Sequence, residues 1–551
     1  MRVTLPDAGL GFVIQLALAV PMLAYFRYAP RRESDAEPAA VPWRGLLGLA
    51  VAFTLLALVG AWANADYVNP DGLAYLTIAQ QYADGKLPVR AYWSPLFSVT
   101  IVPFLWLGLD PFLAAHLATA LGGLLVLVVM AALARRLGLT PPAQLAASAG
   151  VLVLLTPILF RLVIPDALSL GLVLAYLVAV LRVNLSPLRW GAICGITGGV
   201  AYLARAYNLP FFLAHFTLST LLLARQRSLR GLWRGWAVGM AAFGVIALPW
   251  VLAISARHGA LTIGTSSLGN HALVAPQHPY DELSDRLHAR IECWSTHLCP
   301  APDDVLFPWE DPDVGQLVRW RPFESVANLR HQLRVIGVNL VETVAARAAP
   351  VAVPLLLWLM VVVWRRPVRW EHGWLALTVV LYSGGYLLTY SEDARYFWVP
   401  VTVGLLLLLL WIDEAAPCLP RDWLPHRGAH LLFLIGLLVA LVWGPAAGGW
   451  VGLLKPDTCF RDGVAAMGPH LQPPIAGSDE IANYAAFING VRGYGAIDPE
   501  IFPPDKTHAM LVQHGVQTFI TDTPAVYEAR YGYERIAAVQ VCDTTYTVLR
   551  P

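Results

Sequence analysis

Long apolar segments that alternate with short basic connections constrain this chain more than any other feature of its sequence. A membrane-spanning helix needs about 20 apolar residues, and the chain offers about a dozen segments of nearly that length. Lipid offers no hydrogen bonds to the backbone, so such segments must satisfy their own as helices. We predict spans at residues 9–27, 45–63, 111–133, 143–161, 167–182, 188–204, 209–224, 236–254, 346–364, 373–390, 396–412 and 429–447.

The overall composition supports a membrane protein. Of the 551 residues, 57% are hydrophobic and 14% are charged, whereas a soluble globular protein carries about 25% charged residues. The formal net charge of +1 leaves no basic excess to neutralise phosphates, which argues against a nucleic-acid partner. We expect an all-α polytopic membrane protein.

Arginine clusters predict which connections face the cytoplasm, because short cytoplasmic loops are rich in Lys and Arg. The clusters fall in every second connection, at residues 27–32, 135–136, 182–189, 225–234, 365–369 and 421–427. This alternation requires that residues 95–109 do not cross, and two prolines and a short length favour a re-entrant or in-plane segment there. The loops at about 64–110 and 255–345 are then extracytoplasmic.

The C-terminal region, residues 448–551, has a different pattern from the membrane domain expected over residues 1–447. Helix-like and strand-like pieces alternate with turn residues, which predicts a small extracytoplasmic α/β domain. Cys459 and Cys542 lie near its two ends, and an oxidising compartment would let them form a disulfide. Cys293 and Cys299, in an outer loop, are a second candidate pair, and free thiols are the alternative for both.

The first candidate functional residue is Asp71, which follows the second span at the start of "DGLAYLTIAQQYADG". The pattern after it predicts a helix lying flat at the membrane interface. Its apolar side carries Leu73, Leu76, Ala79, Tyr82 and Ala83, and its polar side carries Thr77, Gln80, Gln81 and Asp84. Helix capping is the alternative role for Asp71, because Asp is a preferred N-cap.

A second acid, Asp166, lies in the very short outer turn of "LVIPDALSLGLVL". A carboxylate at the membrane boundary is costly without a partner, so it is a functional hypothesis by default. Pro165 followed by Asp166 is also a helix-start signal, so capping is again the alternative. Together, Asp71 and Asp166 could hold a divalent metal ion, the one candidate cofactor, or an acceptor hydroxyl.

Two arginines lie at outer ends of spans, against the usual charge bias. Arg205 ends one span and Arg395 begins another. Guanidinium geometry suits a phosphate group, so both are candidate phosphate-binding residues. The alternatives are snorkelling of Arg205 to headgroups and an ion pair of Arg395 with Glu392 or Asp393.

His116 is a lone histidine among small residues in "LAAHLATALGG", and this context favours an interhelical hydrogen bond over a role as a ligand. The sequence contains no GxSxG, Walker, HExxH or CxxC pattern, and the nucleotide-binding signatures of soluble sugar transferases are also absent. A nucleotide-sugar donor is therefore disfavoured.

These pieces, in this order, resemble the C-superfamily (GT-C) of integral-membrane glycosyltransferases, in the bacterial branch related to protein mannosyltransferases and aminoarabinose transferases. The resemblance covers roughly residues 45–412 and rests on "NPDGLAYLTIAQQYADG", "WSPLFSVTIVPFLWLG", "TPILFRLVIPDALSLGLVLAYLV", "GGVAYLARAYNLPFF" and "DARYFWVPVTVGLLLLL". It implies transfer of a sugar, with inversion, from a polyprenyl-phosphate-linked donor to a glycan, lipid or protein acceptor at the outer face.

The resemblance also assigns roles to residues. Asp71 matches the catalytic base, Asp166 matches the acid of the second outer turn, and Arg205 and Arg395 match donor-phosphate ligands. The candidate supporting residues are Tyr75, His116, Glu392 and Asp393. One departure matters: relatives of the aminoarabinose type carry Lys-Pro-Pro where this chain has residues 93–95, "WSP", and Lys86 is nearby but out of register.

Two other classes of function compete with this interpretation. A transporter would also have a dozen spans, but transporters usually show two related halves and broken helices at mid-membrane, and no repeated halves are evident in the sequence. A GT-C-like subunit that has lost activity and serves as a scaffold is the second alternative.

Overall fold

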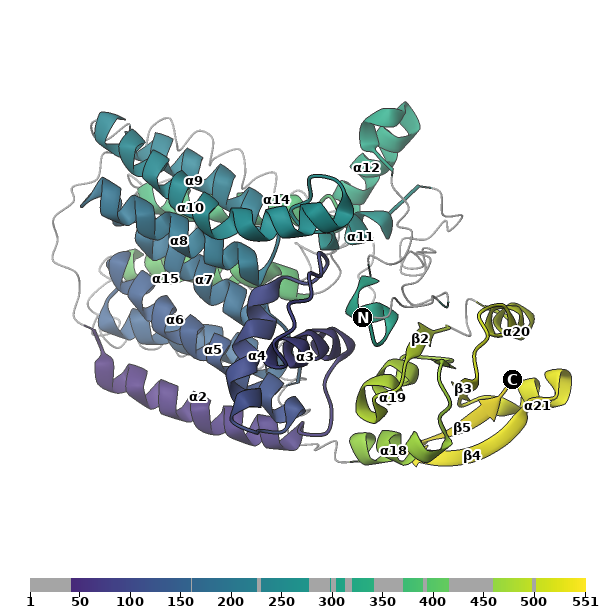
Figure 1. Ribbon diagram of the computed structural model, residues 1–551. Helices are drawn as coiled ribbons and strands as arrows, with labels where there is room; N and C mark the ends of the chain where they lie inside the picture. The colour runs from purple at the N-terminus through teal and green to yellow at the C-terminus, as the bar shows by residue number, and fades with distance from the viewer. Residues whose placement is uncertain are drawn as a thin grey trace.

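The computed structural model contains a bundle of helices followed by a C-terminal sheet domain (Figure 1). It describes residues 41–159, 161–224, 229–276, 298, 304–312, 320–340, 370–389, 394–415, 459–497 and 502–551.

Long apolar helices form the bundle, close to the positions that the sequence predicts. They are α2 (Trp43–Ala63), α5 (Pro111–Arg136), α6 (Pro141–Leu159), α7 (Asp166–Val180), α8 (Pro187–Ala204), α9 (Asn208–Ala224), α10 (Leu229–His258), α14 (Trp370–Tyr386) and α15 (Trp398–Ala415). The buried side chains of these helices form one continuous hydrophobic core.

The number of membrane spans is not confirmed at twelve. Within the described ranges, three helices are long and apolar enough to cross a membrane, at Trp43–Ala63, Pro111–Arg136 and Gly231–His258. Five shorter apolar helices accompany them, including Asp166–Val180 and Asn208–Ala224. The spans predicted at 9–27, 346–364 and 429–447 lie outside the described residues.

Two shorter helices, α3 (Pro70–Ala83) and α4 (Pro95–Trp106), follow α2. A 12-residue helix such as α4 is about 18 Å long, well short of a hydrocarbon core of about 30 Å. The prediction that this segment does not cross therefore agrees with its observed length. The predicted two-sided character of α3 was wrong in its first two turns, where every residue from 72 to 79 is buried, Thr77 included.

Close packing holds α8 against α10. A Cβ atom at Gly191 would lie 2.1 Å from the carbonyl oxygen of Gly235, and one at Gly195 would lie 2.0 Å from that of Gly239. Only glycine allows the two backbones to approach this closely, as small residues do between membrane helices. These contacts hold the N-terminal half of α8 against α10, and the helix continues from there to Ala204, directly before Arg205.

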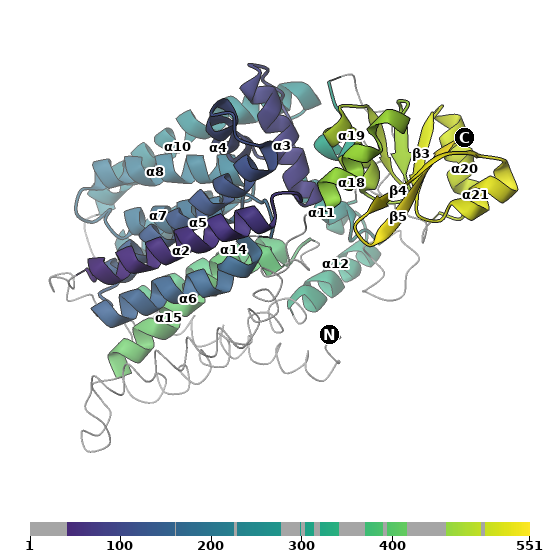
Figure 2. The ribbon, with the colours of Figure 1, turned by 90° about the horizontal axis from the view of Figure 1, so that it is seen from below.

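The C-terminal domain is a five-stranded mixed sheet in the order β2-β1-β3-β5-β4 (Figure 2). Strands β1, β2 and β3 are parallel, whereas β5 pairs antiparallel with both β3 and β4. The predicted α/β character of this region is confirmed. Its elements are α18 (Phe460–Ala466), β1 (Ile475–Gly477), α19 (Ile481–Asn489), β2 (Gly493–Ala496), α20 (Pro504–Gln513), β3 (Thr518–Thr521), α21 (Pro524–Tyr531), β4 (Glu534–Val541) and β5 (Thr544–Arg550).

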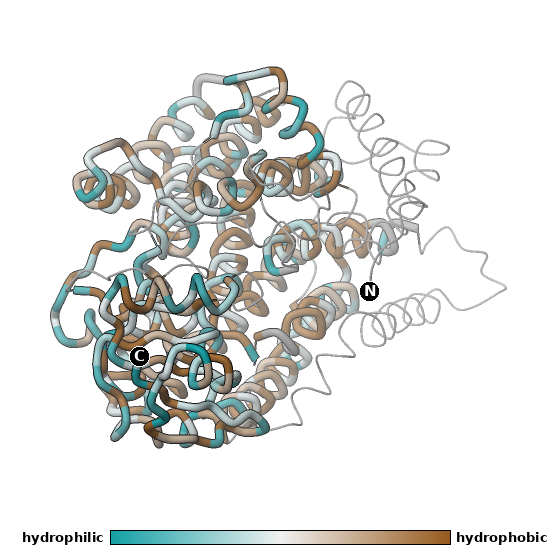
Figure 3. The backbone as a smooth tube through the Cα atoms, turned by 90° about the vertical axis from the view of Figure 1, so that its right-hand side faces the viewer, coloured by the Kyte–Doolittle hydropathy of each residue, from teal (hydrophilic) through white to brown (hydrophobic). Residues whose placement is uncertain are grey.

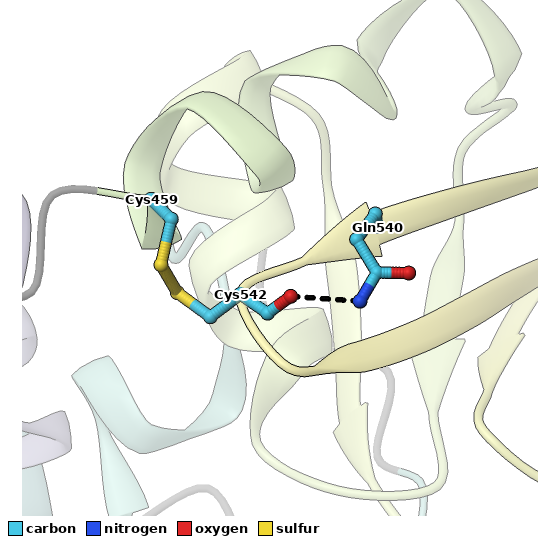
Figure 4. The surroundings of a disulfide bond; sticks show 3 residues. All are labelled: Cys459, Gln540 and Cys542. Carbon is cyan, nitrogen blue, oxygen red and sulfur yellow. Dashed lines mark hydrogen bonds between the residues drawn. A yellow bond between two sulfur atoms is a disulfide. The ribbon is translucent and has the colours of Figure 1, made fainter.

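A disulfide between Cys459 and Cys542 joins the residue before α18 to the turn between β4 and β5 (Figure 4). The two Cα atoms lie 5.1 Å apart, so the predicted proximity of this pair is confirmed. The side-chain amide of Gln540 donates to the carbonyl oxygen of Cys542 and holds the turn in place. Cys293 and Cys299 lie outside the described residues.

The sheet domain docks on the bundle through α18 and α19, which lie between its sheet and α3 (Figures 1 and 2). Arg461 of α18 forms an ion pair of 2.5 Å with Asp110, the N-cap of α5. Hydrophobic residues of both regions share one core that includes Leu73, Phe112 and Tyr484. Figure 3 shows hydrophilic residues concentrated in the connections and around the C-terminal end, whereas the bundle helices are mostly hydrophobic.

Candidate active site

Asp71 is the second residue of α3, after Asn69 as N-cap and Pro70. Its carboxylate contacts side chains from two distant segments. Arg395 Nη1 lies 2.7 Å from Asp71 Oδ2, and the indole nitrogen of Trp309 donates to Asp71 Oδ1 at 3.3 Å. The alternative in which Asp71 is the N-cap does not hold, because the cap position belongs to Asn69.

Asp166 begins α7 and is almost fully buried. Its carboxylate pairs with the guanidinium of Arg205, the residue that ends α8 in an extended conformation. Arg205 is therefore held by an acid within the protein, and its predicted alternative of snorkelling to headgroups does not describe this geometry. The alternative for Arg395 involved Glu392 and Asp393, which lie outside the described residues.

The two acid–arginine pairs meet at a cluster of aromatic rings. The guanidinium carbons of Arg205 and Arg395 lie 4.9 and 5.6 Å from the centroid of the same ring, that of Tyr396. Arg205 also lies 5.6 Å from the ring centroid of Tyr386. Two positive charges with a shared aromatic neighbour are the arrangement that a bound anion would stabilise.

Tyr75 lies one helical turn after Asp71 and is buried beside both pairs. Burial raises the pKa of the Tyr75 hydroxyl, Asp71 raises it further, and the charges of Arg205 and Arg395 oppose the rise. The hydroxyl is thus within electrostatic reach of all three groups and stays protonated. The predicted supporting role of Tyr75 has a suitable location.

A network of buried charges positions Trp309 over Asp71. It is centred on Arg90, whose guanidinium contacts Asp304 at 2.7 Å, Glu310 at 2.8 Å and Asp311 at 3.5 Å. Arg90, Glu310 and Asp311 are all at most 1% exposed. Removing one partner of a buried ion pair costs about 3–5 kcal/mol, so the 304–311 segment is firmly held.

Further contacts hold the same segment against α3 and the residues before α4. Gln81 donates to the Glu310 carboxylate at 2.7 Å, and the indole of Trp93 donates to the backbone carbonyl of Trp309 at 3.1 Å. Sequence reasoning missed Trp309, Arg90 and Glu310, because each one depends on contacts between distant segments. Arg90 could have been noticed from the sequence, because it is an arginine in a predicted outer loop, where basic residues are less expected.

The remaining predicted residues lie apart from this centre or in supporting positions. His116 Nε2 lies 3.0 Å from the backbone carbonyl oxygens of both Asn64 and Tyr67, so it connects α5 to the α2–α3 connection, in line with the predicted hydrogen-bonding role. Trp93, where the resemblance led us to expect a lysine, packs against Tyr75 with 5.0 Å between the two ring centroids. Lys86 is exposed.

A joint metal site of Asp71 and Asp166 stays a prediction. In this structure each of the two carboxylates is paired with an arginine, Asp71 with Arg395 and Asp166 with Arg205. Among the residues that the structure covers, there is no group of three or more His, Cys, Asp or Glu side chains that could hold a metal ion.

The structure is similar to solved membrane glycosyltransferases. It matches ArnT from Cupriavidus metallidurans bound to undecaprenyl phosphate with a TM-score of 0.51 and 17% identity, over 91% of this chain and 98% of that chain. It matches the oligosaccharyltransferase of Archaeoglobus fulgidus in complex with Zn and sulfate with a TM-score of 0.51 and 12% identity, over 87% of this chain and 69% of that chain.

At these identities the likeness concerns the fold, and the expected GT-C resemblance is confirmed at that level. No family model matches the sequence, and no curated protein does.

Proposed function

We propose that this protein transfers a sugar from a polyprenyl-phosphate-linked donor to a glycan, lipid or protein acceptor at the outer face of a membrane. The observation that carries the proposal is the convergence of Asp71, Arg205 and Arg395, from three distant parts of the chain, around Tyr75 and Tyr396. An acid beside two guanidiniums provides the two functions that such a transfer requires: proton removal from the acceptor and stabilisation of a departing phosphate.

The donor phosphate would lie between Arg205 and Arg395. Guanidinium groups bind phosphate oxygens with paired, charge-assisted hydrogen bonds. Negative charge grows on the phosphate as the bond to the sugar breaks, so fixed positive charges stabilise the transition state more than the ground state. Asp166 would keep Arg205 in place when no donor is bound, since the pair is nearly buried.

Asp71 would act as the general base. Its two carboxylate oxygens are oriented by Arg395 and Trp309, and it would take the proton from the acceptor hydroxyl as that oxygen attacks the sugar. General-base catalysis of this kind contributes about 10²–10⁴-fold. One displacement at the sugar carbon gives inversion, in line with what the GT-C resemblance implies.

The fold supports the choice of donor. A structural neighbour over most of this chain was solved with undecaprenyl phosphate, a polyprenyl phosphate with the same head group that this reaction would release. Trp93 stands where aminoarabinose-type relatives have a lysine, so the phosphate would depend on Arg205 and Arg395 here. The sugar and the acceptor are expected to differ accordingly from those of that branch.

A purified-protein assay tests the proposal. The full chain, in detergent or nanodiscs, is incubated with a panel of polyprenyl-phosphate sugars together with candidate glycan, lipid and protein acceptors, and the release of polyprenyl phosphate is measured. Donor-dependent release that disappears in Asp71→Asn is the expected result. Binding of a donor without any release would indicate the inactive scaffold, and movement of a solute into proteoliposomes without release would indicate the transporter.

The sidedness of the site is part of the proposal and has its own test. The arginine alternation predicts that residues 255–345 and 450–551 are outside and that residues 135–142 and 225–235 are inside. A single cysteine introduced at position 140 should resist a membrane-impermeant thiol reagent in intact cells and react after permeabilisation. Labelling of position 140 from outside would contradict the predicted topology and indicate the opposite orientation of the chain.

A further inference from the structure

The turn that carries Arg205 is very short. Helix α8 ends at Ala204, Arg205 follows in an extended conformation with φ −155° and ψ 123°, and α9 begins at Asn208. A residue at a helix end is held by fewer backbone hydrogen bonds than a residue inside the helix. The direction of the Arg205 side chain therefore depends on how this turn is fixed.

Backbone hydrogen bonds close the turn around Arg205. The N–H of Arg205 donates to the carbonyl oxygen of Ala201 at 3.0 Å, and the carbonyl oxygen of Arg205 accepts from the N–H of Asn208 at 3.0 Å. The N–H of Leu209 donates to the carbonyl oxygen of Ala206 at 3.1 Å. The main chain of Asn208 thus holds one side of Arg205, a contact that any residue except proline could supply.

The side chain of Asn208 adds contacts that depend on a short amide. Its Nδ2 donates to the carbonyl oxygen of Ala201 at 2.8 Å and to Oγ of Ser169 at 2.8 Å, and its Oδ1 accepts from the hydroxyl of Tyr382 at 3.3 Å. An amide presents two N–H donors and an acceptor on the same group. Asn208 is only 1% exposed, so these bonds are made away from water.

These contacts join the two helix ends that carry the Asp166–Arg205 ion pair. Ser169 lies one turn after Asp166 on α7, and Ala201 lies one turn before Arg205 on α8. The ion pair links the tips of the two side chains, whereas Asn208 links the backbone segments from which those side chains extend. Both links are needed to give the guanidinium one fixed place.

Tyr207, the neighbour of Asn208, ties the same turn to α14. Its hydroxyl donates to the carbonyl oxygen of Leu381 at 3.0 Å and accepts from the N–H of Gly385 at 3.1 Å. A Cβ atom at Gly385 would lie 2.1 Å from the Tyr207 ring, so glycine makes room for it. The Tyr207 ring centroid lies 4.5 Å from that of Tyr386, one of the rings beside Arg205. The turn and the aromatic rings next to Arg205 therefore pack as one unit.

We propose that Asn208 is a positioning residue for the donor phosphate, because it holds the α8–α9 turn so that the guanidinium of Arg205 is in place before the donor binds. This inference rests on the proposed function, in which Arg205 binds that phosphate. Asn208 is buried and acts through Arg205, without contact to the substrate. Such preorganisation improves affinity, since less conformational freedom is lost on binding.

The test is equilibrium binding of undecaprenyl phosphate to the full chain in nanodiscs, which needs neither a sugar nor an acceptor. Asn208→Ala removes all three side-chain hydrogen bonds and should weaken binding by about tenfold. Ser169→Ala and Tyr382→Phe each remove one partner of Asn208, so each should weaken binding by about two- to threefold.

A double-mutant cycle shows whether the loss passes through Arg205. In an Arg205→Ala background, Asn208→Ala should change the affinity by less than about twofold, because the side chain that it positions is gone. The matched control is Ser219→Ala. Ser219 is buried about three turns further along α9 and accepts from the indole nitrogen of Trp374 at 2.9 Å. This variant should lower the Tm and leave the affinity unchanged in both backgrounds.

A second measurement needs no ligand. Asn208 and the Asp166–Arg205 ion pair hold the same two helix ends together, so the Tm losses of Asn208→Ala and Asp166→Asn should be less than additive in the double variant. The losses of Ser219→Ala and Asp166→Asn should add, because Ser219 has no contact with either helix end. Additive losses in both pairs would contradict the structural link.

The outcomes separate this inference from the proposed function. Wild-type affinity in Asn208→Ala, while Arg205→Ala binds weakly, overturns the inference and leaves the proposed function intact. An equal loss from Asn208→Ala with and without Arg205 also overturns it, because Asn208 would then act through general stability. Wild-type affinity in Arg205→Ala overturns both. If Asn208→Ala does not fold, wild-type affinity in both Ser169→Ala and Tyr382→Phe overturns the inference.

Discussion

Two acid–arginine pairs lie within one site, and they differ in what surrounds them. Asp166 and Arg205 connect the ends of two neighbouring bundle helices, and the acid is only 3% exposed. Asp71 and Arg395 connect a short helix to a distant segment, both at 18% exposure, and a third segment adds Trp309. The two pairs therefore differ in their acids: Asp166, the inner acid, is enclosed by the bundle, whereas Asp71, the outer acid, is partly exposed to solution, and both arginines are equally accessible at 18%.

This difference assigns different roles to chemically identical side chains. Burying a carboxylate is unfavourable because the group loses its hydration, and the ion pair with the arginine compensates for this loss. The simplest role for such a buried acid is therefore to hold the arginine in position. A partly exposed acid with two oriented oxygens can exchange a proton with a substrate. The outer acid is thus the better candidate base, and the inner acid is the better candidate for holding a phosphate-binding arginine in place.

The largest expected effect separates the two acids. Asp71→Asn keeps the size of the side chain and its Trp309 contact but cannot accept a proton, so turnover should fall at least ~10²-fold, or ~2.7 kcal/mol of transition-state stabilisation. In Asp166→Asn, turnover should fall by less than about tenfold, and the affinity for the donor should decrease because Arg205 loses its ion pair with Asp166. Release assays on both variants, with donor titrations, test this. A fully active Asp71→Asn would move the search for the base to Asp166.

The next largest effect concerns donor affinity, which should depend on the two arginines more than on the two acids. Arg395→Ala and Arg205→Ala each remove a charged hydrogen-bonding group worth about 1.5–3 kcal/mol, so donor affinity should weaken by about 10- to 100-fold. Equilibrium binding of a polyprenyl phosphate, which needs no turnover, measures this directly. Arg461→Ala is a control, because its ion pair with Asp110 lies at the domain interface. Unchanged affinity in Arg395→Ala would remove it from the phosphate site.

A smaller effect tests the orientation of the outer acid. Trp309→Phe keeps the ring packing and removes the indole N–H that donates to Asp71. A net hydrogen bond of about 1 kcal/mol corresponds to a roughly fivefold loss of turnover, with donor affinity unchanged. Trp320→Phe, which loses a hydrogen bond to the backbone of His271 in the same long loop, is the matched control. An equal loss in both variants would show that the loop, not Asp71, responds.

The smallest effect on rate is expected from the disulfide. Replacing Cys459 and Cys542 by Ser should leave turnover at 25 °C within about twofold, since α18 and α19 remain docked through aromatic contacts. The free energy of unfolding of the C-terminal domain should nevertheless fall by about 2–4 kcal/mol. Thermal unfolding with and without reductant measures it. If turnover fell by a factor comparable to the loss of stability, the pair of Asp71 and Arg395 would depend on the C-terminal domain more than the observed contacts indicate.

Much of the fold and half of the site were predictable from the sequence. Apolar length and arginine alternation placed the bundle helices within a few residues, and Asp71, Asp166, Arg205 and Arg395 stood out because a charge next to lipid needs a reason. The two-sided pattern assigned to α3 failed at Thr77, because the 304–311 segment packs against this side of the helix, where Gln81 donates to Glu310.

The residues that were missed share one property. Trp309, Arg90 and Glu310 are ordinary in their local sequence, and each gains its role from a contact more than 200 positions away. A propensity or a motif describes a neighbourhood along the chain, whereas these contacts are set by how distant segments pack. Only the three-dimensional arrangement relates them to Asp71.

The wide spacing of these contacts also has a consequence in time. Asp71 leaves the ribosome early, whereas Trp309 and Arg395 follow in that order, the last roughly 320 residues later. At about 5–20 residues per second, synthesis of this interval takes roughly 15–65 s. Throughout it the acid lacks the two side chains that orient its carboxylate. A nascent chain therefore carries no finished site until the segment with Arg395 has been made and has packed against α3.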